Sequence, residues 1–236
     1  MLEVSHYTKR YGRTVACDDV SFVLPNGSVN VLLGPNGAGK STVMKGIAGF
    51  LRFDGRILIN GKPNHLPQSR RELGYVPEIP SFYPNLTVSE HMEFVARAYR
   101  MRNKDEYRAR ANELFELFSL TEHRDKLGSE LSKGMAQKLS ICLGLFTEPL
   151  VLLLDEPFIG LDPHAIKQLK DTMWRLRNEG ATLLVSTHII DSVDMLWDRA
   201  IIMKQGMVRA NVLRDELQNG TDSLEKLFFD VTEGRG

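Results

Sequence analysis

The chain has 236 residues, enough for one large α/β domain or for a core with a subdomain. Its 30 Lys and Arg residues balance its 30 Asp and Glu residues, which argues against a protein built mainly to hold nucleic acid. Cys17 and Cys142 lie far apart in apolar surroundings and match no metal or redox spacing. We therefore expect both to be reduced core residues of a cytosolic protein.

The sequence contains no stretch that predicts a membrane segment. The first residues lack a basic stretch followed by an apolar one, so we expect no signal peptide. The longest apolar run, around Leu150–Leu154, is far shorter than the ~20 residues that a membrane helix needs. Any membrane role is therefore expected to depend on a partner.

The first part of the chain is expected to contain short strands separated by turns. Alternating apolar residues and clusters of Pro, Asn and Gly mark these strands and their ends. Tyr11 falls in the loop after the first strand. The expected strands are Leu2–Tyr7, Val20–Leu24, Val29–Leu33, Ile57–Ile59 as one arm of a hairpin, and Gly74–Pro77.

A glycine-rich stretch fits the pattern G-x-x-x-x-G-K-[ST] between a buried strand and a helix expected at Thr42–Phe50. Glycines let successive backbone N–H groups point at phosphate oxygens, and the helix N-terminus adds its positive end. Lys40 can reach the β- and γ-phosphates, and the Ser41 hydroxyl can ligate Mg²⁺. The expected phosphate-binding residues are Gly34, Pro35, Asn36, Gly37, Ala38, Gly39, Lys40, Ser41 and Thr42.

Segment 87–147 differs from its surroundings because no part of it is expected to form a strand. Thr87-Val-Ser-Glu90 is a capping box that opens a helix. We therefore expect an all-helical insertion in an α/β core. Apolar residues at helical spacing mark a second helix, and they are Tyr107, Ala111, Leu114, Phe115 and Phe118.

The core is expected to resume at residue 148. Leu150–Leu154 is a continuous apolar run, typical of a central parallel strand covered on both faces. Asp162 before Pro163 begins a helix that stops at Gly180, and Thr182–Ser186 is the next central strand. The last expected elements are strands at Ala200–Met203 and Met207–Ala210 and a helical stretch over Leu213–Val231.

Five features follow one another in a fixed order: the phosphate loop, the loop at Glu78, Leu131–Met135, the strand ending in Asp155-Glu156, and His188. The set is specific, because few P-loop proteins add a Glu after that Asp, a Ser-x-Gly helix start upstream and a Ser-Thr-His downstream. Over nearly its whole length, the chain resembles the ATP-binding subunit of ABC transporters.

The resemblance implies a fold and a domain plan. We expect an α/β P-loop NTPase (RecA-like) core with a mainly parallel central sheet, an N-terminal antiparallel β part and an inserted helical subdomain. Residues 1–236 would form one domain. In it, 1–86 and 148–210 form the nucleotide-binding core, 87–147 the helical subdomain and 211–236 a helical tail.

The resemblance also implies roles for residues around the phosphates. Asp155 fits the aspartate that holds Mg²⁺, and Glu156 the general base that polarises the attacking water. His188 matches the switch histidine that contacts the γ-phosphate. Tyr11 matches the aromatic that stacks on adenine, and Asp162 lies in the loop near the partner's phosphate loop. Outside this context, His188 would more often be structural and Tyr11 a packing residue.

The signature motif departs from the usual Leu-Ser-Gly-Gly-Gln of the family. Ser132 and Gly134 are kept, and we expect them to bind the ATP held by the opposite subunit. Ser132 is placed as an N-cap whose hydroxyl and following N–H groups point at a γ-phosphate. Lys133 opposes the helix dipole but adds a charge that attracts phosphate, and Met135 cannot complete a capping box.

Glu78 stands where the family usually has Gln, beside Mg²⁺ and the attacking water. A carboxylate is a stronger ligand for a hard cation but brings negative charge towards the γ-phosphate. We therefore count Glu78 among both the catalytic and the metal-binding residues. Glu78, Lys133 and Met135 resemble the branch of the family that exports drugs, peptides or antibiotics, as does the ending Ser223–Phe228.

The resemblance implies ATP and Mg²⁺ as cofactors and a second ATPase subunit, identical or different, as partner. It also implies a separate integral-membrane permease, which would place the chain at the cytoplasmic face of the cell membrane. No nucleic-acid partner is expected. The family meets its permease through the loop Ile79–Asn85, which here carries Phe82 and Tyr83.

Other functions remain as alternatives. An importer ATPase would carry the same motifs, because the direction of transport rests on analogy. ABC ATPases of translation or DNA repair usually have two nucleotide domains in one chain or a long coiled-coil insertion, and this sequence has neither. A P-loop kinase would have no use for the Ser132 motif or for His188.

Overall fold

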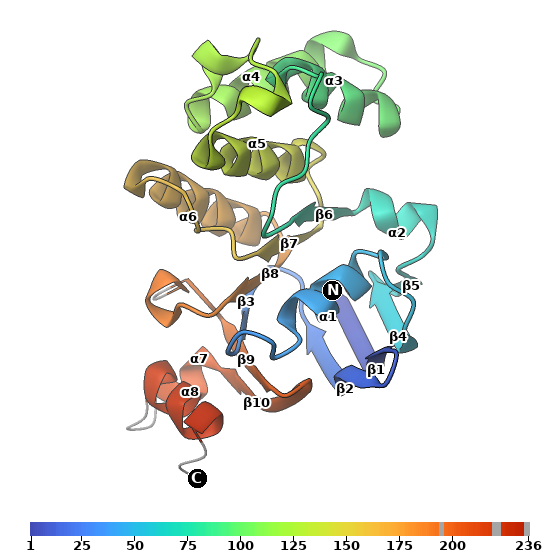
Figure 1. Ribbon diagram of the computed structural model, residues 1–236, viewed down its shortest axis with the longest axis vertical. Coiled ribbons are helices and arrows are strands. Elements are labelled where there is room, and N and C mark those ends of the chain that lie inside the picture. Colours follow the sequence, from blue (N-terminus) through green and yellow to red (C-terminus); the bar gives the residue numbers. More distant parts are fainter. Residues whose placement is uncertain (194–195, 219–222, 234–236) are drawn as a thin grey trace.

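The computed structural model describes residues 1–193, 196–218 and 223–233 (Figure 1). A six-stranded sheet runs through the middle of this part of the chain, in the order β10-β9-β3-β8-β7-β6. Its strands are parallel except β10, which joins β9 in the antiparallel direction. They are β3 (Ser28–Leu33), β6 (Leu73–Val76), β7 (Val151–Asp155), β8 (Thr182–Thr187), β9 (Arg199–Lys204) and β10 (Met207–Leu213).

The centre of this sheet is covered on both faces. Every residue of β3, β7 and β8 is buried, as parallel strands between two layers are. One face packs on α1 (Lys40–Ile47) and a smaller antiparallel sheet, ordered β2-β1-β4-β5 (Figure 1). The strands of the smaller sheet are β1 (Leu2–Tyr11), β2 (Thr14–Leu24), β4 (Asp54–Ile59) and β5 (Lys62–Pro63).

The other face of the central sheet shares one apolar core with the helices. α5 (Lys133–Phe146) lies between the sheet and the outer helices α3 (Val88–Ala98) and α4 (Lys104–Leu117), at the top of Figure 1. α6 (Pro163–Asn178) packs on the same face. The remaining helices are α2 (Pro67–Arg71), α7 (Arg214–Gln218) and α8 (Leu224–Glu233).

The fold class expected from the sequence is confirmed. The described chain has an α/β core with a mainly parallel central sheet, an antiparallel β part and added helices. Between Thr87 and Phe146, the extended pairing in the described chain is an isolated bridge between Thr87 and Leu127. Cys17 and Cys142 are buried and free of disulfides. No described helix combines the length and apolar character needed to cross a bilayer.

Several boundaries differ from the expected ones. Tyr11 ends β1 instead of lying in a loop, because β1 and β2 pair up to Tyr11 and Thr14. α1 stops at Ile47, and Phe50 beyond it is 67% exposed. β10 continues to Leu213, so the tail expected to be helical begins with strand residues that pair with β9. Positions 219–222 and 234–236 of that tail lie outside the described residues.

Candidate nucleotide-binding and catalytic site

The phosphate loop joins β3 to α1, and its backbone conformation depends on glycine. Gly37 and Gly39 have φ angles of +80° and +103°, which side-chain-bearing residues rarely adopt. A Cβ on Gly39 would lie 2.8 Å from the Ala16 carbonyl oxygen. The loop is also tied to the turn after β9, because the Gly206 N–H donates to the Ala38 carbonyl at 3.0 Å.

The N-terminus of α1 is left open to an anion. It has no side-chain cap and no acidic residue in its first turn. The first N–H groups of a helix have no partner within the helix and carry the positive end of its dipole. This arrangement suits a phosphate at the start of α1.

Lys40 is the buried cation of the site. Its side chain is 6% exposed, and Nζ donates to the carbonyl oxygens of Gly34 at 2.7 Å and Pro35 at 3.4 Å. Nζ also lies 3.9 Å from Oε1 of Glu156. Burial lowers the pKa of Lys40, while the charges of Glu156, Asp155 and Glu78 act in the opposite direction. Lys40 is therefore held inside the loop by groups that a phosphate can replace.

Asp155 ends β7 with one carboxylate oxygen satisfied and one free. Its residue is 1% exposed. Oδ1 accepts from Ser41 Oγ at 3.2 Å and from the Ser186 hydroxyl. Oδ2 is buried without a hydrogen-bond partner among the described residues. A buried bare carboxylate oxygen is costly and is a preferred ligand of Mg²⁺. Ser41 and Asp155 therefore fit a cation that is also bound to nucleotide phosphates.

Glu156 follows in a strained backbone conformation. Its φ is +48°, unusual for a residue with a side chain. The sharp turn is held by its N–H, which donates to Ser186 O at 3.1 Å. It places Oε1 2.7 Å from Nδ1 of His188, so that the imidazole donates to the carboxylate. The side chain is 7% exposed, and the Glu156–His188 pair is a compact unit beside Lys40.

Other sequence-derived candidates lie away from this cluster. Ser132 caps α5 by accepting from the Met135 N–H at 3.3 Å. Tyr11 is 50% exposed, with Lys9 Nζ 5.0 Å from its ring centre. Within the described parts of the chain, no hydrogen bond or ion pair joins Tyr11, Ser132 or Gly134 to the phosphate loop. Glu78 is exposed in the loop after β6, near enough for its charge to act on Lys40.

The signature helix is instead linked to the loop before α6. A Cβ on Gly134 would come within 2.9 Å of the Gly160 carbonyl oxygen. Asp162 caps α6 by accepting from the Ala165 N–H at 2.9 Å, and Lys138 Nζ lies 2.6 Å from its other oxygen. The bond from Lys138, with the cap, lowers the pKa of Asp162 to about 2. The start of α5 and the start of α6 therefore form one polar unit.

Two residues near the cluster had been given no role from the sequence. Ser186 bonds both Asp155 and the Glu156 N–H. Tyr75 on β6 has a buried hydroxyl near Asp155. Both depend on which strands flank β7, because β8 and β6 lie on either side of it. Local sequence does not reveal the order of strands in a parallel sheet. The sequence therefore predicted that Ser186 and Tyr75 lie in strands, but not that they lie beside Asp155.

Comparisons with known proteins decide the family. The family model described as ABC transporter matches residues 17–159. The chain belongs to this family. A solved ATP-binding subunit of an ABC transporter is 35% identical, with a TM-score of 0.91, and the match covers 98% of this chain and 99% of that chain. A dimeric bacterial ABC transporter cassette is 26% identical, with a TM-score of 0.82, and the match covers 90% and 98%.

Curated relatives of this ABC ATPase carry different transport names. The ABC-type transporter ATP-binding protein EcsA of Bacillus subtilis is 35% identical, covering 99% of this chain and 97% of that protein. LptB, of the lipopolysaccharide export system of Haemophilus influenzae, is 32% identical and covers 93% of each. CysA, for sulfate/thiosulfate import in Mycobacterium bovis, is 36% identical, covering 87% of this chain and 59% of that protein. The chain is thus an ATP-binding, ATP-hydrolysing subunit of an ABC transporter, whereas the names include both export and import.

Proposed function

We propose that this ABC ATPase drives export through a separate membrane permease, by closing on a second ATPase subunit around MgATP. The observation that carries the proposal is the cluster of Lys40, Asp155, Glu156 and His188 at the carboxyl ends of β3, β7 and β8 and the start of α1. Ligands of open α/β sheets bind at that edge. The cluster combines a phosphate cation, a free metal ligand and a buried base.

The contacts support a role for each of these residues. Lys40 exchanges its loop carbonyls for the β- and γ-phosphate oxygens. Ser41 and Asp155 would hold Mg²⁺, which neutralises phosphate charge when bound. Glu156 takes the proton of the attacking water, and His188 orients that carboxylate through the 2.7 Å contact. Glu78, exposed at the mouth of the site, tunes the charge near the γ-phosphate.

A second subunit supplies the other half of the site. Ser132 and Lys133 are exposed at the open start of α5, remote from their own phosphate loop. Two copies placed head to tail would let each α5 N-terminus face the γ-phosphate bound by its partner. Asp162, joined to α5 through Lys138, would accompany it to the same interface. Tyr11, exposed at the end of β1, would cover the adenine.

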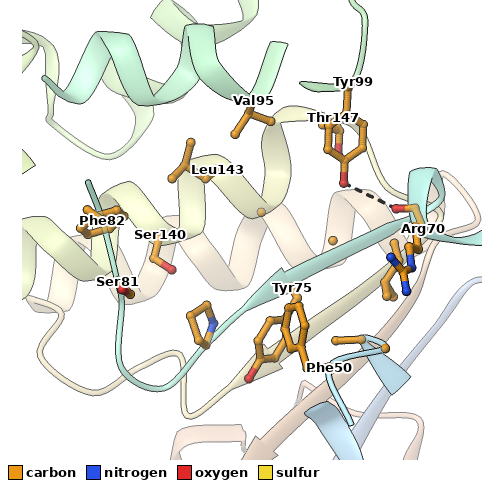
Figure 2. Close-up of a pocket in the computed structure, with 16 residues that line it drawn as sticks. Phe50, Arg70, Tyr75, Ser81, Phe82, Val95, Tyr99, Ser140, Leu143 and Thr147 are labelled. Atoms are coloured by element: carbon orange, nitrogen blue, oxygen red, sulfur yellow. Dashed lines mark hydrogen bonds between the residues drawn. The ribbon is translucent and has the colours of Figure 1, made fainter. Parts of the chain in front are cut away.

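A groove of about 350 Å³ lies between the core and the helical subdomain, and we propose that it binds the permease (Figure 2). Its lining is largely apolar and includes Phe50, Tyr75, Phe82 and Val95. Ile79 and Tyr83 are 79% and 55% exposed in the loop beside it. Such a surface fits an apolar segment of a permease, and that contact would hold the chain at the cytoplasmic face of the membrane.

Hydrolysis by a Glu156→Gln variant tests the assignment of the site. Removing the base should lower ATP turnover by ~10²–10⁴-fold while ATP still binds, because the phosphate contacts remain. Glu116→Gln, an exposed position on α4, is the matched control and should keep wild-type turnover. Undiminished turnover in Glu156→Gln would contradict the assignment.

The direction of transport needs a cellular test. Glu78, Lys133 and Met135 favour an exporter, and LptB is named for export. A strain that lacks the chain should become sensitive to exported drugs, peptides or antibiotics, and Glu156→Gln should fail to restore resistance. A growth requirement relieved by extra nutrient, without such sensitivity, would favour import instead, as named for CysA.

A further inference from the structure

Tyr75 lies where the groove and the phosphate site meet. It is part of β6, which pairs with β7 so that Tyr75 stands opposite Leu153. Side chains two residues apart on a strand share a face, so Tyr75 is on the same face as Leu153 and Asp155. An aromatic side chain is long enough to reach such a diagonal neighbour. The ring of Tyr75 lines the groove, while its hydroxyl is buried.

Two buried oxygens lack partners at this point. The Tyr75 hydroxyl and Oδ2 of Asp155 each have no partner in hydrogen-bonding geometry among the described residues. They belong to diagonal neighbours across the β6–β7 pairing, because Tyr75 stands opposite Leu153 and Asp155 follows Leu153 two residues later on the same face. A neutral phenol is a donor and a carboxylate oxygen is an acceptor. The two groups therefore complement each other, and a small movement or one water would join them.

The other end of the Tyr75 ring is exposed to the groove. Phe50 packs against it edge-on, with ring centres 5.6 Å apart. Figure 2 shows the two rings side by side, with the Tyr75 hydroxyl pointing away from Phe50. Phe50 itself is 67% exposed. Phe50 and Tyr75 both line the groove, so a segment that enters it would contact these two rings.

We propose that Tyr75 is a positioning residue that orients Oδ2 of Asp155 towards the catalytic cation. Through Tyr75, the affinity for that cation would depend on what occupies the groove. This inference rests on the proposed MgATP site and adds a regulatory connection to it. Oδ1 is already fixed by Ser41 and Ser186, so Tyr75 controls the oxygen that remains for the metal. Partners of metal ligands fix ligand orientation and often set metal affinity.

Nucleotide binding without turnover tests this role. In the Glu156→Gln background, the Kd of a fluorescent ATP analogue is measured in EDTA and in saturating Mn²⁺, and the ratio gives the gain in affinity due to the metal. Tyr75→Phe should reduce that gain roughly tenfold and leave the Kd in EDTA unchanged. Tyr107→Phe, which removes the same atom from a buried tyrosine of α4, should leave both values unchanged.

The groove's influence is tested by a double-mutant cycle. Phe50→Ala should lower the metal-dependent gain about threefold, because the Tyr75 ring loses its packing partner. In the Tyr75→Phe background it should have no further effect, since the hydroxyl is already absent.

The outcomes separate the two proposals. An equal gain in Tyr75→Phe and its parent, or additive effects in the cycle, would overturn the role of Tyr75 while leaving the ATP site intact. If Mn²⁺ does not raise the nucleotide affinity of the Glu156→Gln parent, both the proposed MgATP site and the role of Tyr75 are contradicted. A lower melting temperature of Tyr75→Phe with an unchanged gain would show packing alone, and would also overturn the inference.

Discussion

At the scale of single residues, the candidate site is built from polar groups that bind one another. Lys40 is surrounded by loop carbonyls and Glu156, and Glu156 is bonded to His188. Lys40 and Glu156 are buried charges that are paired, which limits the cost of desolvation. In the ATP binding that we propose, phosphate oxygens would replace these protein oxygens around Lys40.

Lys40→Ala should abolish ATP binding, lowering affinity at least ~100-fold, because the charge-assisted contacts to two phosphates are lost. Equilibrium binding of a fluorescent ATP analogue measures the change. Lys45→Ala, on the exposed side of α1, is the control and should bind like the wild type. Unchanged affinity in Lys40→Ala would count against the phosphate loop as the binding site.

His188→Ala should lower kcat roughly 100-fold with ATP affinity changed only a few-fold, because we propose that its contact with Glu156 orients that carboxylate. Steady-state hydrolysis together with nucleotide binding separates the two effects. His65→Ala, at an exposed position, serves as control. A rise in KM with kcat intact would mean that His188 acts in binding alone, against its proposed orienting role.

At the scale of elements, the start of α6 is stabilised by one side chain. Asp162 accepts from Ala165 and pairs with Lys138, which holds its pKa near 2, below the ordinary value of 3.8. A depressed carboxylate pKa stabilises the fold above the unfolded pKa, and this contribution is lost as pH falls from about 4 towards 2. Asp162 thus makes the junction of α5 and α6 sensitive to acid.

Asp162→Ala should destabilise the protein by about 1 kcal/mol at pH 7, through loss of the cap. Chemical denaturation at pH 7, 5, 4 and 3 measures the difference from wild type, which should narrow below pH 4. Asp171→Ala, exposed in the middle of α6, should have little effect at any of these values. A difference that stays constant down to pH 3 would show that the charge of Asp162 has no part in it.

The sequence predicted elements well where they depend on residues that are close together in the chain. The phosphate loop could be predicted because glycine spacing and Lys40 define it. The capping box at Thr87 and the N-cap at Asp162 marked helix starts that the structure shows. The end of α1 was misplaced because Phe50 continues the apolar period but packs on Tyr75 across a turn. The strand extension to Leu213 depends on pairing with β9, which no local pattern reveals.

At the scale of the whole molecule, the described chain holds the phosphate loop and the signature motif in separate places. The phosphate loop lies between the sheets, whereas Ser132 begins α5 in the helical part (Figure 1). From sequence, the signature could be assigned to the opposite subunit only through the family resemblance. Gly134 and Lys138 of α5 contact the loop before α6, and these contacts connect the helical part to the core.

The central claim is that ATP closes this chain on a second ATPase subunit. The most direct test is the mass of the Glu156→Gln protein by light scattering, with and without MgATP. We expect a monomer without nucleotide and a dimer with MgATP, and the added substitution Lys40→Ala should prevent the dimer. The claim would be contradicted if the Glu156→Gln protein binds MgATP but does not associate with a second ATPase subunit, either alone or when its permease is present.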